Sequence, residues 1–508
     1  MADIIRIQLQ PSGESVDVER GTALRDVLYA FGVEFPCGGT GSCGHCRVEV
    51  LEGELPASDD EAWLLSEQEL RAGWRLACRA RVDGPLTLKV EQHATPILAD
   101  QSELSFEPQR GFGVAVDIGT TTLVAQLIDL ESGRVMASQT ALNPQGTHGS
   151  DVMTRLQYAL DETARRELSS LIRTAVGRLV TDSMSTANLR AGAVNRVVCV
   201  GNTVMHHLFS ELEPHALTRV PFESSNTGLQ QFSAAELGWN IGKDVAVRFL
   251  PCLGGFVGSD ILAGMLATRI HEDRALSVLV DLGTNGEIVI GNSERLLCAS
   301  TAAGPAFEAG GIRQGMRATR GAIDQVRIDS NEFHCHVVGG GEARGICGSG
   351  LVDAVACGLE SGRIEASGRL CDGRKSFGLT GSVELAQADI RQLQLAKAAI
   401  AAGIRILLER LGKSERDVRR LFLAGAFGNY VDRRSARRIG LIPETSQNSD
   451  AVGNTALRGA KLALFCGESS DWRFADLRSR VEHVSLATSA EFQETFIEQT
   501  RFPDESPG

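Results

Sequence analysis

The sequence predicts an α/β protein in which a small cysteine-bearing unit precedes a duplicated, two-lobed body. The main observation is a repeat: GVAVDIGTTTLVAQLID, residues 113–129, returns as SVLVDLGTNGEIVIGN, residues 277–292. In each copy an apolar strand ends at an aspartate, Asp117 or Asp281, and a glycine–threonine turn leads into a second apolar strand. Because the same unit occurs twice, we expect two similar lobes that face each other across a cleft.

The composition excludes several classes of protein. The chain has 508 residues, of which 43% are apolar and 23% charged, as in ordinary globular proteins of about three domains. A formal net charge of −13 disfavours nucleic acid and anionic membranes as partners. The start, MADIIRIQLQ, lacks a signal-peptide pattern, and no apolar run reaches the ~18 residues that cross a membrane. The twelve cysteines are mostly scattered, as in reduced thiols, so we expect a cytoplasmic protein.

The first 92 residues are expected to form a domain of their own. Apolar and polar residues alternate over 4–10 and again over 15–18, which predicts a hairpin. An apolar stripe over 24–31 predicts a short helix.

A group of cysteines follows this helix. PCGGTGSCGHCRV has the spacing C-x5-C-x2-C, and a fourth cysteine lies in WRLACRARV. Plant-type ferredoxins hold a [2Fe–2S] cluster with C-x4-C-x2-C and a distant cysteine; this loop is one residue longer and resembles the adrenodoxin-like spacing. A structural zinc site is the alternative, although such sites favour two C-x2–4-C pairs. The predicted metal ligands are Cys37, Cys43, Cys46 and Cys78.

The remaining boundaries follow from composition and from the repeat. Residues 93–111 are polar, contain two prolines and lack periodicity, which predicts a flexible linker that lets the cluster domain swing. We expect the first lobe over 112–275, the second over 276–470, and a C-terminal strand, helix and tail over 471–508.

The two repeated turns are suited to bind phosphate. Backbone N–H groups and threonine hydroxyls donate hydrogen bonds to phosphate oxygens, and the carboxylate binds Mg²⁺ directly or through water. One copy alone would indicate little, because aspartate and glycine are ordinary turn residues. Asp117 and Asp281 are the candidate catalytic residues, for Mg²⁺ or for orienting the attacking water. The other predicted phosphate-binding residues are Gly119, Thr120, Thr121 and Thr122 in the first turn, and Gly283, Thr284 and Asn285 in the second.

Two later segments extend this pattern. LFLAGAFGN, residues 421–429, predicts a short buried strand that breaks into a glycine turn, where Gly425, Ala426 and Phe427 would border an adenosine. GICGSGLVDAVACGL, residues 345–359, predicts a glycine turn opening an apolar helix, which suits a hinge between lobes.

Together these motifs resemble the acetate and sugar kinase/Hsp70/actin superfamily of ATPases, whose bodies are two RNase H-like lobes. With an N-terminal [2Fe–2S] ferredoxin-like domain of β-grasp fold, the chain is similar to the reductive activators of corrinoid-dependent enzymes. The resemblance covers residues 1–465. Three further stretches match that family: VGNTVMHHLF, PCLGGFVGSDILAG and STAAGPAFEAGGIRQGM, at residues 200–209, 251–264 and 300–316.

The resemblance implies an ATP-dependent transfer of one electron from the [2Fe–2S] cluster to Co(II) of a corrinoid (cobalamin) methyltransferase protein, which restores Co(I). It implies ATP and Mg²⁺ as cofactors, and that corrinoid protein and a low-potential electron donor as partners. Ser300 and Thr301, which open an Ala-Gly-Pro loop, are candidates to face the corrinoid partner, with a plain turn as the alternative. The sequence leaves open whether the chain forms a homodimer.

Two other functions fit parts of the pattern. A small-molecule kinase with a redox-sensing ferredoxin head would need a substrate pocket and a catalytic base, neither of which the sequence identifies. An electron-transfer component of an oxygenase would need a flavin or NAD module. The one match to the dinucleotide fingerprint, Gly39-x-Gly41-x-x-Gly44, lies inside the cysteine loop.

Overall fold

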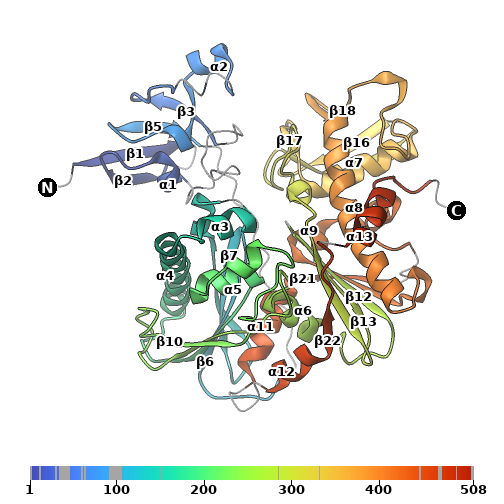
Figure 1. Cartoon of the computed structure of the whole chain (residues 1–508). Coiled ribbons are helices and arrows are strands. Elements are labelled where there is room, and N and C mark those ends of the chain that lie inside the picture. Colours follow the sequence, from blue (N-terminus) through green and yellow to red (C-terminus); the bar gives the residue numbers. More distant parts are fainter. Residues whose placement is uncertain are drawn as a thin grey trace.

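The computed structural model shows a small N-terminal domain and a body of two lobes (Figure 1). The N-terminal domain stands above the first lobe, and the two lobes lie side by side. None of the helices in the described ranges is long and apolar enough to cross a membrane. The structure describes residues 3–10, 13–28, 31, 33, 46–58, 61, 64–90, 106–149, 151–283, 285–330, 332–444, 448–466, 472–487 and 489–504.

The N-terminal domain is a five-stranded mixed sheet in the order β2-β1-β5-β3-β4. The predicted hairpin is confirmed as an antiparallel pair of β1 and β2, and the predicted helix is described over Leu24–Leu28, as α1. Strand β1 also pairs in parallel with β5, which brings the two ends of the domain together. The elements are β1 (Ile4–Gln10), β2 (Ser15–Glu19), α1 (Leu24–Leu28), β3 (Arg47–Glu52), α2 (Glu67–Arg71), β4 (Trp74–Leu76), η3 (Ala77–Arg79) and β5 (Leu86–Lys89).

The first lobe is built on a six-stranded sheet in the order β10-β11-β9-β6-β7-β8. Its core lies between this sheet and the long helix α4, with α5 beside them. The elements are β6 (Phe112–Ile118), β7 (Thr122–Asp129), β8 (Val135–Leu142), η4 (Pro144–Thr147), α3 (Val152–Tyr158), α4 (Glu162–Thr186), β9 (Val194–Val200), α5 (Thr203–Ser210), η5 (His215–Thr218), β10 (Gln230–Ser233), β11 (Ala246–Phe249) and α6 (Ser259–Thr268).

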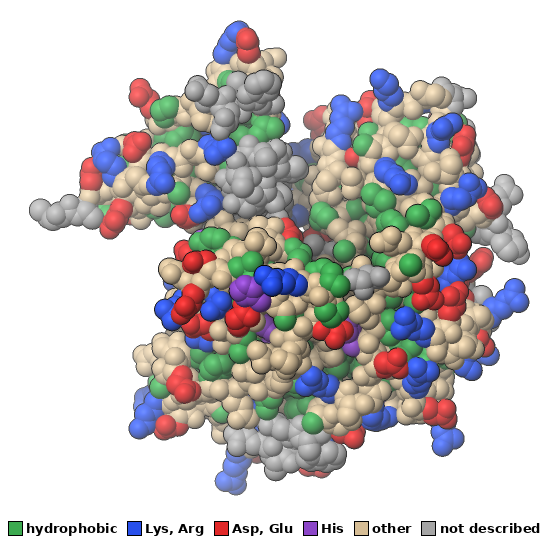
Figure 2. All heavy atoms as spheres, in the orientation of Figure 1, with side chains coloured by type: hydrophobic (Ala, Val, Ile, Leu, Met, Phe, Trp, Pro, Cys, Tyr) green, Lys and Arg blue, Asp and Glu red, His purple; other side chains and the backbone are tan. Residues whose placement is uncertain are grey.

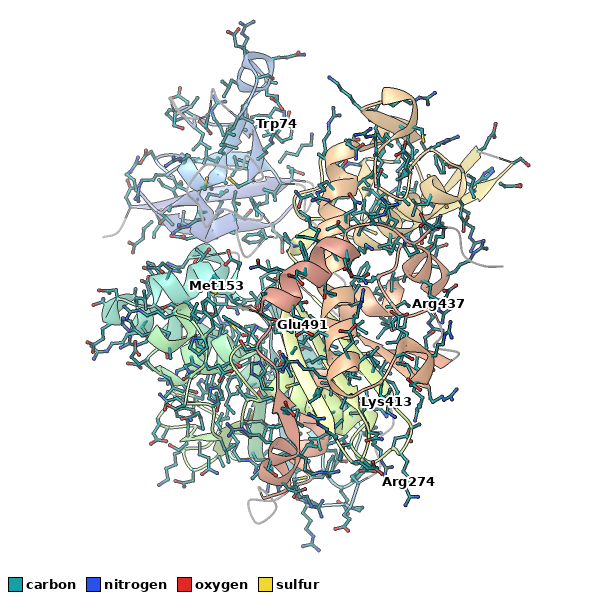
Figure 3. All side chains as sticks on the ribbon, turned by 45° about the vertical axis from the view of Figure 1, so that its right-hand side comes forward. Trp74, Met153, Arg274, Lys413, Arg437 and Glu491 are labelled. Atoms are coloured by element: carbon teal, nitrogen blue, oxygen red, sulfur yellow. The ribbon has the colours of Figure 1, made fainter. Side chains whose placement is uncertain are left out.

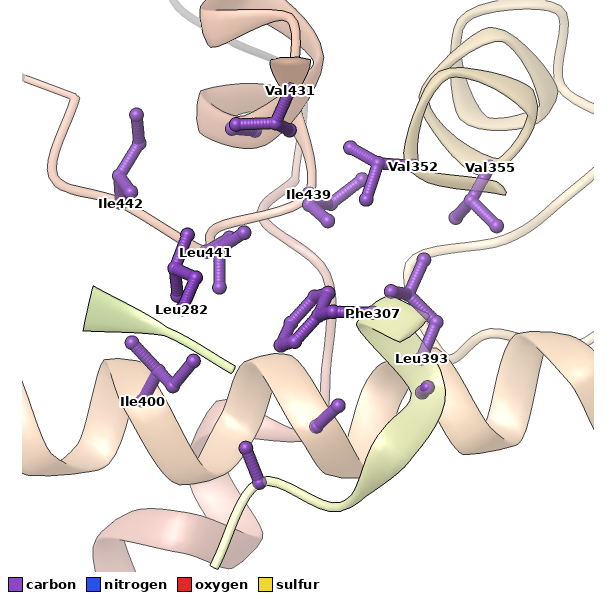
Figure 4. Close-up of a cluster of buried hydrophobic side chains, with 14 of the residues drawn as sticks. Leu282, Phe307, Val352, Val355, Leu393, Ile400, Val431, Ile439, Leu441 and Ile442 are labelled. Atoms are coloured by element: carbon purple, nitrogen blue, oxygen red, sulfur yellow. The ribbon is translucent and has the colours of Figure 1, made fainter. Parts of the chain in front are cut away.

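The second lobe has a six-stranded sheet in the order β21-β20-β12-β13-β14-β22 and a tip formed by β15–β19 and α7. Side chains from η6, α7 and α8 converge on Phe307 in its core (Figure 4). The elements are β12 (Ser277–Leu282), β13 (Gly286–Gly291), β14 (Leu296–Thr301), η6 (Pro305–Glu308), β15 (Ala322–Asp329), β16 (Glu332–Val337), β17 (Gly345–Ile346), α7 (Gly348–Glu360), η7 (Cys371–Gly373), β18 (Ser376–Thr380), β19 (Val383–Ala386), α8 (Gln387–Arg410), η8 (Glu415–Asp417), β20 (Arg420–Ala424), α9 (Gly425–Tyr430), α10 (Arg433–Arg438), β21 (Asn448–Gly453), α11 (Thr455–Leu464), α12 (Trp472–Ser479), β22 (Val481–His483) and α13 (Ala490–Gln499).

The two sheets share one topology. In each, a three-stranded antiparallel meander (β6-β7-β8 or β12-β13-β14) is extended in parallel from its first strand, by β9 and β11 in one lobe and by β20 and β21 in the other. This is the RNase H-like arrangement, so the fold predicted from the repeat is confirmed. The first strand of each meander is central and carries the aspartate of the repeated turn.

Helices α6 and α11 lie between the two sheets. They cross closely, because a Cβ added to Gly459 would lie 2.0 Å from the carbonyl oxygen of Ala263. Helix α11 follows the second-lobe strand β21 but packs on β6 and β9 of the first lobe. A single hydrophobic core therefore joins these helices to both sheets, and their N-terminal ends reach the region between the lobes.

The predicted linker is only partly described, since residues 91–105 lie outside the described ranges. From Phe106 onward the chain packs against the body. The Phe106 ring stacks on Phe465 with centroids 4.2 Å apart, and the side chain of Gln109 donates to the carbonyl oxygen of Phe465 over 2.6 Å. Residues 106–111 therefore belong structurally to the body.

The C-terminal segment is fastened to α8 by a buried lysine. Lys397 is 1% exposed, and its Nζ donates to the carbonyl oxygen of Arg501 over 2.6 Å. The neighbouring Phe502 ring is also buried, 5.5 Å from the same Nζ. Burial lowers the pKa of Lys397 from 10.5 to about 7.

This depressed pKa predicts that Lys397→Met stabilises the protein at neutral pH. The unfolded lysine is charged up to pH 10.5 whereas the folded one loses its proton near 7, so wild-type stability should rise between these values. Below pH 7 the buried charge costs on the order of 4 kcal/mol, against about 2 kcal/mol for the lost hydrogen bond. We expect Lys397→Met to gain roughly 2 kcal/mol at pH 7 in urea unfolding, and to lose that advantage by pH 9.5. The exposed Lys413→Met is the control, and an equal pH dependence in both variants would contradict the argument.

Candidate functional site

The two repeated turns meet where the lobes face each other. Asp117 is the next-to-last residue of β6, and Asp281 holds the same position in β12. The charge of Asp117 is felt at the second turn, because it contributes to raising the pKa of Asp281. The fold therefore brings the two repeated turns close together, as the repeat predicted.

The first turn is held rigidly. The N–H of Gly119 donates to the carbonyl oxygen of Thr122 over 3.0 Å, and a Cβ on Gly119 would lie 2.7 Å from that oxygen. Asn202, the N-cap of α5, donates from Nδ2 to the hydroxyl of Thr120 over 2.9 Å. The N–H of Asn143 donates to the carbonyl oxygen of Thr121 over 2.8 Å. These contacts fix the backbone of the turn.

In the second turn the closing hydrogen bond spans two residues instead of three. The N–H of Gly283 donates to the carbonyl oxygen of Asn285 over 3.1 Å, whereas the predicted Thr284 lies outside the described residues. Across the sheet, Asp281 stands between Ala424 of β20 and Glu287 of β13. The strand pairing thus places a second carboxyl group directly beside Asp281.

The predicted glycine turn after β20 is a short helix, α9, that begins at once with Gly425. Gly425 has φ +81° and packs against the second turn. Phe427 stacks on Phe307 at 4.8 Å and is buried in the lobe core, so its ring serves packing. The side chain of Ala426 lies outside the described residues. The proposed contact of these residues with adenosine stays a prediction.

Replacing Gly425 by alanine should disturb this site. The added Cβ would lie 2.6 Å from Oδ1 of Asp281 and 2.9 Å from the carbonyl oxygen of Leu282. We expect a loss of about 2 kcal/mol in urea unfolding and at least about tenfold weaker nucleotide binding. Gly412→Ala is the matched control, because Gly412 has φ +64° but open space around its Cβ position. Equal losses in the two variants would mean that backbone strain alone, without the clash, explains the effect.

Three functional candidates were missed in the sequence. Asp260 lies in the first turn of α6, Glu287 lies in β13, and Asn454 is the N-cap of α11. Asn454 donates from Nδ2 to Oδ2 of Asp117 over 2.8 Å. A signal was available for two of them: Glu287 is a charged residue inside the apolar run GEIVIG, and Asp260 opens the apolar helix after Gly258.

Burial raises the pKa of all four carboxyl groups, and the charge of a neighbouring carboxylate adds to the shift at Asp260, Asp281 and Glu287. Burial raises the pKa of Asp117 to about 6, although its hydrogen bond from Asn454 acts in the opposite direction. Burial and then the charge of Asp117 raise the pKa of Asp281 to about 7. Burial and then Asp281 raise that of Asp260 to about 8, and burial and then Asp260 raise the pKa of Glu287 well above its usual range. A cation bound here would allow these groups to ionise.

This donor set fits Mg²⁺ held mainly by water and phosphate. Within the described residues, no group of three or more His, Cys, Asp or Glu side chains is arranged to chelate a metal. Mg²⁺ usually keeps several waters and binds proteins through one or two carboxylates together with substrate phosphates. Carboxylates that lie near one another without converging as a chelating group match that habit better than they match a closed metal cage.

Ser300 and Thr301 lie elsewhere than expected. They are the last two residues of strand β14 and do not lie in a loop or turn. The hydroxyl of Thr301 donates to the carbonyl oxygen of Gly286 over 3.1 Å, and that of Ser300 lies 3.5 Å from Glu287. Both hydroxyls thus contact β13.

The cysteine site is described in part. Cys37 and Cys43 lie outside the described residues, whereas Cys46 and Cys78 are both described. The N–H of Ala77 donates to the carbonyl oxygen of Cys46 over 2.8 Å, which brings the distant cysteine to the start of β3. Their Sγ atoms are 3.3 Å apart and are not joined by a disulfide bond. Two thiolates on one tetrahedral metal, each about 2.3 Å from it, lie roughly 3.8 Å apart, so this pair fits a shared metal atom.

Comparison with known proteins agrees with this architecture. Models for a 2Fe–2S iron–sulfur cluster binding domain, for the RACo middle region, and for the C-terminal ASKHA domain of RACo match residues 7–83, 112–273 and 275–507. The corrinoid activation enzyme RamQ of Eubacterium limosum is 34% identical over 422 residues, covering 77% of this chain and 70% of RamQ. The [Co(II) methylated amine-specific corrinoid protein] reductase of Methanosarcina barkeri is 27% identical and covers 76% of each chain.

A solved structure extends the match to the whole chain. A reductive activator for a corrinoid, iron–sulfur protein superposes with a TM-score of 0.68 and 25% identity, over 98% of both chains. The fold and site therefore define a ferredoxin domain joined to an ASKHA ATPase body, with a [2Fe–2S] cluster and ATP as its cofactors. The chain belongs to the family of reductive activators of corrinoid proteins. These similarities favour that function over the kinase and oxygenase alternatives.

Proposed function

We propose that this protein is an ATP-dependent reductive activator that delivers one electron from its [2Fe–2S] cluster to Co(II) of a corrinoid methyltransferase protein, restoring Co(I). The observation that supports this most is the presence in one chain of a close ferredoxin-type thiol pair and a cleft with two Asp-Gly turns. The choice of a corrinoid protein as substrate is supported by the RamQ and M. barkeri relatives, whose names specify corrinoid activation and reduction. A low-potential donor would resupply the electron.

The division of labour follows the domains. Residues 1–92 would hold the cluster through Cys37, Cys43, Cys46 and Cys78. Residues 112–275 and 276–470 would form the two lobes of the ATPase. The segment 93–111 would join the two parts, and residues 471–508 would brace the second lobe through α13 and Phe502.

The residues of the cleft have separable tasks. Backbone N–H groups at Gly119 and Gly283, with the hydroxyls of Thr120, Thr121, Thr122 and Thr284 and the side chain of Asn285, would bind phosphate oxygens. Asp117 and Asp281 would bind Mg²⁺ or orient the attacking water. The bound Mg²⁺ would favour the attack by neutralising phosphate charge. Asn454 and Asn202 would position Asp117 and Thr120.

ATP is needed for an energetic reason. The Co(II)/Co(I) couple is very low, so transfer from an ordinary [2Fe–2S] domain runs uphill. A ligand that binds one conformation ~10⁴-fold more tightly than another supplies about 5.5 kcal/mol, equivalent to about 0.23 V for one electron. Closure of the lobes around nucleotide is therefore large enough to make the transfer favourable.

The test is a reduction assay with and without nucleotide. The anaerobically reconstituted protein and a low-potential reductant are mixed with a Co(II) corrinoid protein, and Co(I) is followed by its absorption. ATP should accelerate reduction at least about tenfold over ADP or no nucleotide, and a non-hydrolysable analogue separates binding from hydrolysis. Equal rates without nucleotide would refute the coupling.

A further inference from the structure

Helix α1 of the N-terminal domain faces helix α3 of the first lobe. In Figure 1, α1 lies at the lower edge of the domain, directly above α3. In Figure 3, Met153 of α3 again lies at the top of the lobe, just beneath the domain. Figure 2 shows charged and hydrophobic side chains along the line where the two parts meet. The views therefore agree that this end of the domain lies next to the first lobe.

On the lobe side, three side chains from three elements form a cluster that we call the polar seat: His148, Tyr158 and Glu167. The rings of His148 and Tyr158 stack with centroids 4.8 Å apart. The hydroxyl of Tyr158 donates to Oε2 of Glu167 over 2.8 Å, and Nε2 of His148 lies 3.7 Å from Oε1 of the same residue. The Glu167 side chain stays 49% exposed, so the seat presents a negative charge at the surface.

Charges of the N-terminal domain reach the polar seat. Burial lowers the pKa of His148, and the charge of Glu167 opposes that shift. The charges of Arg25 and Asp26, both in α1, also act on the pKa of His148. Burial raises the pKa of Tyr158, and the charge of Arg25 opposes this second shift. Because Coulomb interactions weaken with distance, Arg25 lies close to the stacked rings and to the carboxylate that they contact.

Arg25 and Glu167 are complementary across this boundary. Nε of Arg25 lies 2.9 Å from Oδ1 of Asp26, its neighbour in the sequence. Asp26 is 51% exposed, and an exposed pair of this kind contributes at most about 1 kcal/mol. It therefore leaves Arg25 able to attract a second carboxylate. Opposite charges on two facing surfaces favour their association and fix its orientation.

The docked face is close to both predicted sites. Helix α1 packs against η3, which carries the predicted cluster ligand Cys78, and the N–H of Leu24 donates to the carbonyl oxygen of Ala80 over 2.9 Å. On the lobe, the segment that leads into the polar seat begins at Asn143. The side chain of Asn143 donates from Nδ2 to the carbonyl oxygen of Gly119 in the first turn over 2.8 Å. One boundary thus separates a predicted cluster ligand from the first phosphate turn.

We propose that the N-terminal domain docks on the first lobe through Arg25 of α1 and the polar seat. The docked domain occupies one place on the body instead of swinging freely on residues 91–105, a tether that could span at most about 50 Å. Docking would hold the cluster beside the nucleotide lobe between electron transfers. This use of the docked state rests on the proposed function, whereas the docking itself does not.

Small-angle X-ray scattering of the full chain tests the docking without any corrinoid, at about 50 mM NaCl so that charges are weakly screened. Arg25→Glu puts a negative charge against Glu167, and we expect a larger radius of gyration and a larger maximum dimension than in wild type. Glu167→Arg should expand the chain in the same way, because two positive charges then face each other. The double variant Arg25→Glu/Glu167→Arg restores opposite charges and should return to wild-type dimensions.

Arg71→Glu is the matched control. Arg71 is an exposed arginine of the same domain, but it lies in α2, at the end of the domain away from the first lobe (Figure 1). This variant should scatter as wild type does. Melting temperatures equal to that of wild type establish that the variants are folded.

Two results would overturn the proposal. Arg25→Glu could stay as compact as wild type, which would mean that the domain is not held at the polar seat. The double variant could instead stay as expanded as the single ones, which would mean that Arg25 and Glu167 do not face each other in solution. Failure of the corrinoid assay alone would leave the docking result intact.

Discussion

Replacing Cys78 by alanine is expected to produce a protein that binds ATP normally but reduces no corrinoid. Cys78 is the fourth predicted cluster ligand, and its Sγ lies 3.3 Å from that of Cys46. Three thiolates cannot complete the Cys₄ set that holds a [2Fe–2S] cluster. The reconstituted variant should lose the visible absorption of the cluster. Its bound iron should fall at least about tenfold, and it should form no measurable Co(I). Nucleotide affinity should stay within about twofold, because the cleft is in another domain.

Cys371→Ala is the matched control for this experiment. Cys371 is also partly exposed, but it lies in η7 of the second lobe and donates to the carbonyl oxygen of Gly362. This variant should keep the colour and the iron of wild type. Metal analysis of wild type also decides between the two metals that the spacing left open: iron with sulfide supports the cluster, whereas one equivalent of zinc would replace it with a structural site.

Local patterns were sufficient to predict the parts of this fold that depend on neighbours in the sequence. The repeated strand–turn–strand unit predicted both meanders, since alternating burial and glycine turns are short-range properties. The cysteine spacing likewise predicted the metal ligands, and the charge-free apolar segment 421–424 predicted a buried strand. The sequence therefore identified Asp117 and Asp281 correctly as central strand-end residues, and their chemical roles stay predictions.

Contacts between distant segments were not predictable in this way. Asn454 reaches Asp117 from 337 positions away because α11 crosses from the second lobe to the first sheet. Asp260 joins the cleft because α6 lies between the sheets with its first turn toward Asp281. Neither crossing leaves a periodic signal in the sequence, so both residues needed the folded chain to be recognised.

The packing of some predicted functional residues was not apparent from the sequence. Phe427 stacks on Phe307, a packing contact that the sequence did not indicate, and its expected contact with adenosine stays a prediction. Ser300 and Thr301 were expected in a partner-facing loop, yet they end a strand. In both cases the nearby glycines suggested a turn. In the structure, strand β14 continues to Thr301 and helix α9 begins at Gly425.

Replacing Asp281 by asparagine is expected to abolish nucleotide turnover while stabilising the fold. Asparagine keeps the shape of the side chain but removes the charge that would bind Mg²⁺ or orient water. We expect the ATPase rate and ATP-dependent corrinoid reduction to fall about 10²–10³-fold, as when a preorganised charged group is lost from an active site. Asp244→Asn, at an exposed aspartate of the first lobe, should leave both rates unchanged.

The stability of this variant should change in the opposite direction. Burial and Asp117 raise the pKa of Asp281 from 3.8 to about 7, so the folded protein binds a proton that the unfolded chain has lost between these values. Wild-type stability therefore falls as the pH rises from about 4 to about 7, and the full cost of the charge is present above pH 7. Asp281→Asn removes that cost and should gain roughly 2 kcal/mol at pH 8 in urea unfolding without nucleotide. A variant that lost both activity and stability would show that Asp281 supports the fold, and its placement at the phosphate site would then be wrong.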